Sequence, residues 1–396
     1  MIILEICFLM EGDENERSRI MERVVLGLSG GVDSAVAAYL LKEAGYEVVP
    51  VFMRNWDSQL NNDYLGNPTI NDDVCSQEVD YADAKAVAEH LGLELRRVDF
   101  IKEYWDRVFT YFLEEYAKGR TPNPDILCNK EIKFKAFLDY AFSIDADWIA
   151  TGHYARIEHH QDGESVMLRG VDNNKDQTYF LCQLNQHQLE RVLFPLGDIT
   201  KPEVRKIALE QNLPVAKKKD STGICFIGER DFKAFLKNYI PAKPGKMVDI
   251  ETKKVIGEHQ GIMYYTIGQR KGLNIGGKGG PWFVCGKDYD QNILYIAQGD
   301  QNKWLMSDGC TVTDVNWISG KPPVGEYDCT AKFRYRQKDN DVSIHFNEDG
   351  TLYCTFKNQV KSVTPGQEAV FYQGEVCLGG GTIDKVYKNN EEITYL

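Results

Sequence analysis

The sequence lacks the features that mark membrane proteins and small metal-binding modules. No apolar run in its 396 residues approaches the roughly eighteen residues that a membrane-spanning helix needs, so we expect no membrane partner. Its ten cysteines are far apart: the closest pair is Cys310 and Cys329, and no CxxC motif exists. This spacing argues against a zinc ribbon or an iron–sulfur cluster.

Basic residues are also in the minority. Lys and Arg number 46 against 59 Asp and Glu, which gives a formal net charge of −13. Taken alone, this excess of acid argues against a nucleic-acid partner. Acidic enzymes still bind RNA through local basic patches, so the placement of the basic residues matters more than their sum.

The first twenty residues lack a targeting signal. Residues 1–10 are apolar but have no basic start and no small-residue cleavage site, and four acidic residues follow within residues 11–16. We expect residues 1–20 to be an N-terminal extension, with Met21 as an alternative start because the first predicted strand follows it. Without a secretory signal, the cysteines are expected to be thiols of a cytoplasmic protein.

The length predicts two or three domains. Residues 21–215 alternate strands and helices, which is typical of a parallel sheet with helices on both faces. The expected strands are residues 24–28, 47–53, 95–99 and 148–151. The expected helices are residues 34–44, 78–91, 101–117 and 130–142, and residues 55–75 are expected to form a loop or lid.

The pattern changes after about residue 214. Residues 217–223 are typical of a mobile loop, and a short helix and a glycine-rich, strand-like stretch follow, so we assign residues 216–305 to a central domain. Residues 306–396 are expected to form a C-terminal β-barrel. Its expected strands are residues 311–317, 327–336, 342–346, 352–356 and 369–373.

The strongest chemical signal is the loop SGGVDS at residues 29–34, between the first strand and the first helix. Gly30 and Gly31 allow close backbone approach, and successive amides at a helix N-terminus bind anions. Asp33 would repel phosphate unless Mg²⁺ bridges them, and a carboxylate is a suitable ligand for Mg²⁺. The loop is no Walker A motif. The alternative is a tight strand-to-helix turn with a polar cap.

Two cysteines lie in distinctive surroundings. Cys128 follows Asn123, Pro124 and Asp125, and the pattern places it at a helix start, where the helix dipole and nearby lysines lower a thiol pKa. Cys225 lies between glycines, shortly after three lysines. The alternatives are a structural Cys128 that caps a buried helix and a Cys225 that is simply a small buried hydrophobe.

The loop resembles the pyrophosphatase-type loop of the adenylating ATPases, which split ATP into AMP and pyrophosphate and have a Rossmann-like, adenine nucleotide α-hydrolase-like fold. With both cysteine segments, residues 22–385 closely resemble the tRNA-specific 2-thiouridylase family. Further matching segments are residues 151–156, 175–181, 257–261, 265–272, 334–337 and 374–381. The chain departs from the family in residues 1–20 and in the long loop around residues 55–57. That loop is typical of the mitochondrial branch, which leaves the mitochondrial matrix as an alternative location.

The resemblance implies roles for individual residues. ATP and Mg²⁺ would bind at a set that includes Asp33 as the metal ligand: Gly27, Leu28, Ser29, Gly30, Gly31, Val32, Asp33, Ser34, Met53 and Gly152. Cys225 would carry a persulfide and Cys128 would be its partner, within disulfide reach in at least one state. Asp125 would act as a general acid or base. The residues expected to contact tRNA are Asn123, Pro124, Asp125, Lys175, Asp176, Gln177, Arg336 and Gln337.

The resemblance also implies the partners. Such enzymes adenylate the wobble uridine, position 34, of the tRNAs for Lys, Glu and Gln and then replace its O2 with sulfur. The sulfur would come as a persulfide from a cysteine desulfurase or a sulfur-relay protein. Basic residues with interleaved aromatics are expected to form the RNA-binding patches: Lys130, Lys133, Lys135, Lys217, Lys218, Lys219, Arg270, Lys271, Lys332, Arg334, Arg336 and Lys338.

Two alternatives from different classes stay open. Another adenylating ATPase, such as a lysidine or argininosuccinate synthetase, would share the loop but leave Cys128 and Cys225 unexplained. A non-catalytic tRNA-binding protein would need neither an intact loop nor both cysteines. Mass spectrometry of tRNA products separates the first alternative, and tRNA-dependent exchange of pyrophosphate into ATP separates the second.

Overall fold

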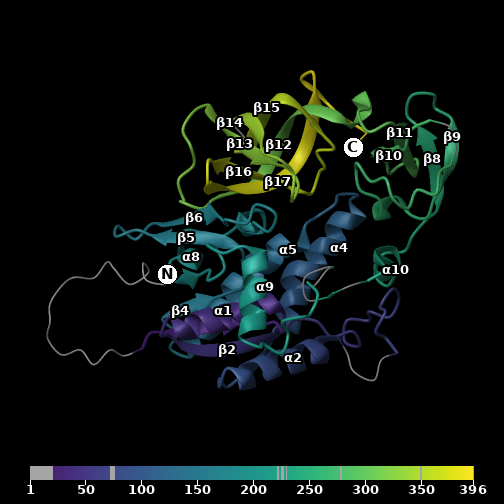
Figure 1. Cartoon of the computed structure of the whole chain (residues 1–396). Coiled ribbons are helices and arrows are strands. Elements are labelled where there is room, and N and C mark those ends of the chain that lie inside the picture. The colour runs from purple at the N-terminus through teal and green to yellow at the C-terminus, as the bar shows by residue number, and fades with distance from the viewer. Residues whose placement is uncertain are drawn as a thin grey trace.

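We describe the protein from a computed structural model, in which residues 21–71, 76–220, 223, 227–228, 230–276, 279–347 and 350–395 are described. The expected extension at residues 1–20 and Cys225 lie outside these residues. Three bodies follow one another along the chain: a sheet covered by helices, a small sheet and a β-barrel (Figure 1). Among the described residues, no helix is long and apolar enough to cross a membrane.

The first body is built on a five-stranded parallel sheet in the order β3-β2-β1-β4-β7. Its strands are β1 (Arg23–Gly27), β2 (Glu47–Arg54), β3 (Arg96–Asp99), β4 (Trp148–Ala150) and β7 (Val192–Leu193). Val24, Val25 and Leu26 are fully buried because helices cover both faces of the sheet, as a run of apolar residues in a parallel strand predicts. The strand order reverses beside β1, and ligands bind at such switch points.

The four predicted helices of this body are present, the last of them beginning earlier than predicted, and the three helices that follow them were not predicted. The helices of this body are α1 (Val32–Glu43), α2 (Ser76–His90), α3 (Ile101–Tyr104), α4 (Thr110–Ala117), α5 (Pro124–Leu127), α6 (Phe137–Ser143), α7 (Thr178–Leu181), α8 (Gln186–Leu189) and α9 (Lys201–Glu210). Two π-helical segments interrupt the predicted α-helices: η1 (Trp105–Phe109) and η2 (Cys128–Ala136). Such segments are rare in proteins as a whole, and those that occur often lie at functional sites.

The predicted start of the helix that bears Cys128 is wrong. The helix begins at Pro124, with the Asn123 side chain accepting a hydrogen bond from the Asp125 amide as its N-cap. Asparagine at the N-cap and proline at the first position are favoured because one satisfies an unpaired amide and the other has none. Cys128 therefore lies in the second turn, beyond the unpaired amides of the first.

A hairpin joins the first body to the barrel. Strands β5 (Ala155–His159) and β6 (Ser165–Arg169) pair around a turn at residues 160–163. β6 then pairs with β17 (Val376–Lys388) of the barrel through Leu168 and Val376. Strands β5 and β6 lie directly beneath the barrel in Figure 1.

The central body contains a four-stranded sheet in the order β10-β11-β8-β9. Helix α10 (Phe232–Lys237) precedes β8 (Gly245–Asp249), β9 (Val255–His259), β10 (Trp282–Asp288) and β11 (Ile293–Gln298). His259 is 1% exposed, and its ring nitrogens contact the Asn292 carbonyl and the Gly261 amide. It therefore has a structural, hydrogen-bonding role.

The last body is the predicted β-barrel. Its strands are β12 (Met306–Trp317), β13 (Tyr327–Lys332), β14 (Asn340–Phe346), β15 (Leu352–Lys361), β16 (Glu368–Gln373) and β17, with β18 (Glu391–Glu392) at the end. The sheet closes because β12 pairs with both β15 and β17. The strand predicted for residues 327–336 ends early, at Lys332, because a turn follows in which Arg336 has a φ of +64°. Strand β17 was not predicted.

Candidate active site

One cavity of about 650 Å³ opens where β1 and β4 end. Its wall combines the loop after β1, the segment after β4, the helix that contains Cys128 and a turn of the barrel. Residues from two bodies of the fold thus meet at the switch point of the parallel sheet, where ligands bind in folds of this kind.

The loop after β1 is shaped by short contacts of its own. Gly30 has a φ of +75°, and a side chain there would meet the Asp80 carbonyl at 2.2 Å, so only glycine fits. The Ser34 hydroxyl accepts a hydrogen bond from the Ser29 amide at 3.1 Å and donates one to the Gly31 carbonyl at 3.1 Å. The loop therefore presents the N-terminus of the twelve-residue helix α1 to the cavity, as anion binding requires.

The residues predicted for the adenine nucleotide line the same cavity. A side chain at Gly27 would lie 3.0 Å from the Met53 side chain, and one at Gly152 would lie 2.9 Å from the Ser34 amide. His153 is buried, and its Nδ1 lies 2.7 Å from the Thr151 hydroxyl. Burial, and then the charge of Lys133, hold the pKa of His153 well below its usual value. His153 is therefore a neutral hydrogen-bonding group in the cavity wall.

Asp33 is the acidic residue of the loop, and the side chains of Lys201 and Tyr154 contact its carboxylate. Lys201 Nζ lies 2.7 Å from Oδ1 and 2.9 Å from Oδ2, and the Tyr154 hydroxyl donates to Oδ1 at 2.7 Å. Burial, followed by the charge of Asp33, raises the pKa of Tyr154, so its hydroxyl remains a donor. Mg²⁺ is commonly held by one or two carboxylates together with substrate phosphates, and this single carboxylate beside an anion-binding loop fits that pattern.

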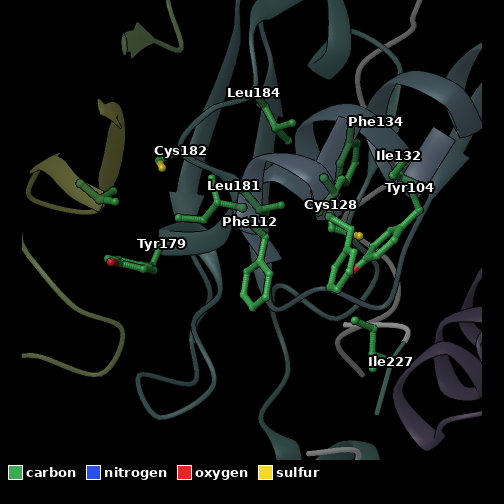
Figure 2. Packing of buried hydrophobic residues seen from close by; sticks show 14 of the residues in the cluster. Tyr104, Phe112, Cys128, Ile132, Phe134, Tyr179, Leu181, Cys182, Leu184 and Ile227 are labelled. Carbon is green, nitrogen blue, oxygen red and sulfur yellow. The ribbon is translucent and has the colours of Figure 1, made fainter. Parts of the chain in front are cut away.

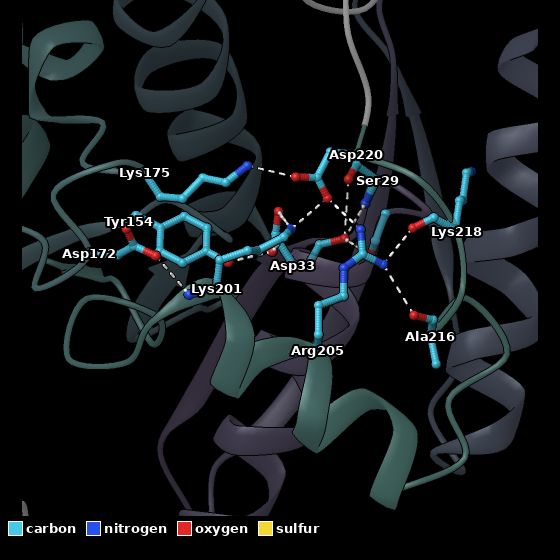
Figure 3. A network of polar contacts seen from close by, with 12 residues as sticks. Ser29, Asp33, Tyr154, Asp172, Lys175, Lys201, Arg205, Ala216, Lys218 and Asp220 are labelled. Carbon is cyan, nitrogen blue, oxygen red and sulfur yellow. Dashed lines mark hydrogen bonds and ion pairs between the residues drawn. The ribbon is translucent and has the colours of Figure 1, made fainter. Parts of the chain in front are cut away.

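A second carboxylate, Asp220, lies beside Asp33 in a network that we did not predict (Figure 3). Asp220 Oδ2 lies 2.6 Å from Lys175 Nζ, and Oδ1 lies 2.8 Å from Lys201 Nζ and 2.5 Å from an Arg205 nitrogen. Burial opposes ionisation, but hydrogen bonds from Lys175 and Lys201 hold the pKa of Asp220 well below its usual range. No local motif marks Lys201 or Arg205: Lys201 meets Asp33 across 168 positions of the sequence, and Arg205 meets Asp220 across 15.

Cys128 lies just behind the cavity wall. Asp125, Asn129 and Lys133 recur every fourth residue and line the cavity, while Cys128 between them is 0% exposed. Figure 2 shows its sulfur beside Tyr104, with Ile227 close by in the same buried cluster. Ile227 is two residues from Cys225 in the sequence, so the described part of that segment reaches the neighbourhood of Cys128.

Four of the eight residues expected to contact tRNA line the cavity and four do not, and Asn123 and Pro124, at the start of α5, belong to the second group. Lys175, Gln177 and Arg336 line the cavity together with Asp125. Asp176 and Gln337 do not: Asp176 is 5% exposed and accepts hydrogen bonds from the Thr178 hydroxyl and the Gly170 amide. The Gln337 side chain accepts from the Phe333 amide at 2.8 Å and so stabilises the turn that presents Arg336.

Several residues of the expected basic patches are engaged within the protein. Lys218 Nζ lies 2.7 Å from Asp80, 2.6 Å from Asp83 and 3.1 Å from the Gly30 carbonyl. Arg334 donates to the Ile267 carbonyl at 2.9 Å, and burial lowers its pKa. These two residues hold segments around the cavity together, and their contact with RNA stays a prediction.

Known proteins resemble the chain over almost its whole length. Residues 22–229 match the tRNA methyl transferase HUP domain family, residues 233–298 the tRNA methyl transferase PRC-barrel domain family and residues 307–383 the aminomethyltransferase beta-barrel domain family. The tRNA-specific 2-thiouridylase MnmA of Mycoplasma capricolum subsp. capricolum is 58% identical over 373 residues, which cover 93% of this chain and 100% of that protein.

Two further bacterial relatives carry the same name. The tRNA-specific 2-thiouridylase MnmA of Lysinibacillus sphaericus is 57% identical over 374 residues, which cover 94% of this chain and 97% of that protein. The protein of this name from Staphylococcus aureus strain JH9 is 56% identical over 376 residues, which cover 94% of this chain and 98% of that protein.

Proposed function

The chain belongs to the tRNA-specific 2-thiouridylase family, and we propose that the cavity at the end of β1 and β4 is where it activates and thiolates its uridine. The protein is a tRNA 2-thiouridylase, a sulfurtransferase that uses ATP. The observation that carries the proposal is the wall of the cavity, which combines an anion-binding loop, the helix face around Cys128 and Lys175 and Arg336.

The names of the matching families and of the relatives disagree about the group that is transferred. The family descriptions say methyl transferase, whereas relatives that are 56–58% identical over nearly the whole chain are named thiouridylases. We follow the relatives because their match is full-length. A loop suited to ATP phosphates and a cysteine behind the cavity wall also fit thiolation better than methylation, which needs neither.

The ATP end of the site would work through the loop at residues 29–34. Its amides and the hydroxyls of Ser29 and Ser34 would hold the phosphates, with the adenosine between Gly27, Met53 and Gly152. Asp33 would hold Mg²⁺, which neutralises phosphate charge when it is bound. The uridine O2 would attack the α-phosphate, the bond to pyrophosphate would break, and AMP would be left joined to the base.

The sulfur end of the site would work through the two cysteines. The outer sulfur of a persulfide on Cys225 would attack C2 of the activated uridine, and AMP would leave with the former O2. Cys128 would then attack the Cys225 sulfur and release the thiouridine, which leaves a disulfide, or would free sulfide for the attack on C2. Asp125 lines the cavity beside Cys128 and would move the proton.

The tRNA would be held where the first body meets the β-barrel. Asn123 and Pro124 begin α5 and would lie beside the base. Lys175, Gln177 and Arg336 lie on the cavity wall and would contact the RNA directly. Asp176 and Gln337 would act through the backbone they hold. We further propose the wobble uridine of the tRNAs for Lys, Glu and Gln as substrate, a desulfurase or relay protein as sulfur donor, and the cytoplasm as location.

The decisive experiment is nucleoside analysis of tRNA from cells that lack this protein. Loss of 2-thiouridine from position 34, with its return when the wild-type chain is supplied, is the expected result. Unchanged 2-thiouridine together with the loss of lysidine or another adenylation-dependent product would replace thiolation with a different reaction of the same ATPase superfamily.

A further inference from the structure

Asp220 lies in a cage of three cations that come from two separate segments of the chain. Lys201 and Arg205 lie one turn apart on α9, and Lys175 approaches from the segment before α7 (Figure 3). Each of the three donates to the carboxylate within 2.8 Å. Lys201 also contacts Asp33, so three cations face two carboxylates and one positive charge is left over. Guanidinium and ammonium groups gathered in this way are typical of phosphate sites.

Lys201 lies where neither helix formation nor burial favours a lysine. It is the first residue of α9, the positive end of the helix dipole, where cations are disfavoured. Its side chain is only 11% exposed, and buried lysines are rare unless they are paired. Its position beside Asp33 therefore reflects a role in the site more than a contribution to the helix.

We infer that Lys201, Arg205 and Lys175 form a binding site for the terminal phosphates of ATP and that Asp220 occupies this site as an internal anion until nucleotide binds. The inference rests on the proposed ATP site and adds to it a named set of cations. Asp33, Asp220 and Lys175 line the cavity, whereas Lys201 and Arg205 lie behind the two carboxylates. A phosphate that replaces the Asp220 carboxylate from the cavity side meets the same three donors.

The charges of the cluster account for the exchange. When Asp33 turns to Mg²⁺, Lys201 loses the carboxylate that it contacts through both oxygens and keeps only Asp220. The three largely paired cations then share one carboxylate, which favours the entry of a further anion. The terminal phosphates bring that charge next to the loop. Asp220 is already tied to the loop, because Lys218, two residues before it, donates to the Gly30 carbonyl at 3.1 Å.

Binding of pyrophosphate with Mg²⁺ to the full-length protein, measured by calorimetry without tRNA, tests the inference. Asp220→Asn removes the competing charge, so we expect affinity to rise about tenfold, as one charge-assisted hydrogen bond is worth. Lys201→Met should weaken binding by at least about tenfold. Lys206→Met, on the same helix with a side chain that is 73% exposed, is the matched control and should bind like the wild type.

If Asp220 only clamps the three cations for stability, its substitution should not raise the affinity for pyrophosphate. Folded Asp220→Asn protein that binds pyrophosphate no better than the wild type overturns the inference, even if Lys201→Met fails to fold. If the wild type binds ATP and pyrophosphate but Lys201→Met binds both normally, the inference also fails while the proposed ATP site stands. If the wild type binds neither, the proposed ATP site fails together with the inference.

Discussion

Arg230 and Asp63 form an ion pair that is almost completely buried. The Arg230 Nε and a terminal nitrogen lie 2.9 Å and 2.8 Å from one Asp63 oxygen, and the two side chains are 3% and 0% exposed. The Trp56 indole donates to the same oxygen at 3.0 Å. Asp63 belongs to the loop at residues 55–71, and Arg230 lies five residues after Cys225. The pair therefore anchors the downstream end of the Cys225 segment to the first body.

Breaking this pair should cost far more than losing a surface ion pair. Asp63→Asn is expected to lower the free energy of unfolding by about 3–5 kcal/mol, because it leaves a buried guanidinium without its counter-charge. The double variant Asp63→Leu with Arg230→Met should lose less than either single variant. Chemical denaturation of the set, with the exposed Glu210→Gln as control, measures this, and equal losses for single and double variants would refute the mechanism.

Glu368 should make the stability of the protein depend on pH. Burial raises its pKa to about 7, against hydrogen bonding from Thr382. A carboxyl group with a raised folded-state pKa stabilises the fold fully below its unfolded-state pKa, and this contribution is lost as pH rises through about 7. The wild type should therefore lose about 3 kcal/mol between pH 4.5 and pH 8 through this group.

Substitution isolates that contribution. Glu368→Gln should flatten the pH dependence of the thermal unfolding midpoint above pH 5, because glutamine cannot ionise. The exposed Glu326→Gln should leave the dependence as in the wild type. A Glu368→Gln protein that still loses stability between pH 5 and pH 8 to the same extent as the wild type would assign the dependence to other groups.

Asp33→Ala should abolish adenylation, because the proposed Mg²⁺ would lose its carboxylate and Lys201 would lose one of its two carboxylate partners. The measurement is release of AMP and pyrophosphate in the presence of tRNA. A fall in rate of at least about a hundredfold is expected for the loss of a catalytic electrostatic contact. Normal AMP release by this variant would remove Asp33 from the mechanism.

The two cysteines should fail at different steps. Cys225→Ser should accept no persulfide and make no thiouridine, whereas Cys128→Ser should load radiolabelled sulfur on Cys225 but not complete the transfer to tRNA. Cys285→Ser, a buried cysteine of the central sheet, is the control. Thiolation by Cys225→Ser, or a normal rate with Cys128→Ser and the physiological donor, would show that the roles are assigned wrongly.

Arg336 should contribute to tRNA binding through charge alone. Arg336→Glu is expected to weaken binding and to reduce the slope of log K against log salt by about 1, because one fewer phosphate counterion is released. Arg96→Glu, an exposed change on the edge strand β3, should leave the slope unchanged. An Arg336→Glu protein with wild-type affinity and slope would exclude this turn from the RNA interface.

The parts of the site that were predictable are those that a short segment encodes. The loop at residues 29–34 carries its glycines, serines and carboxylate within six positions, and the structure places it where the pattern predicts. The helix start at Pro124 was also visible, since an asparagine cap precedes a proline, but the prediction placed it six residues later. That error put Cys128 at the wrong position of its helix.

The parts that were not predictable depend on distant segments. Lys201 meets Asp33 across 168 positions of the sequence, and nothing near Lys201 marks it except the start of an ordinary helix. The π-helical segments η1 and η2 have the same apolar spacing as α-helices, so hydrophobic periodicity alone cannot separate them. The end of β13 was also missed: the side-chain pattern favoured a strand through Arg336, but the backbone of Arg336 is left-handed, and the strand ends at Lys332.

The β5–β6 hairpin has a consequence for how the protein can be divided. Arg169 of β6 donates to Asp339 at 2.7 Å, and its guanidinium lies 3.7 Å from the centre of the Tyr372 ring. A protein shortened after residue 305 would leave the outer edge of β6 without the strand that covers it, and open edges promote aggregation. The barrel is therefore not an exchangeable module: recombination that swaps it between relatives would have to carry the hairpin, 137 or more residues upstream, along with it.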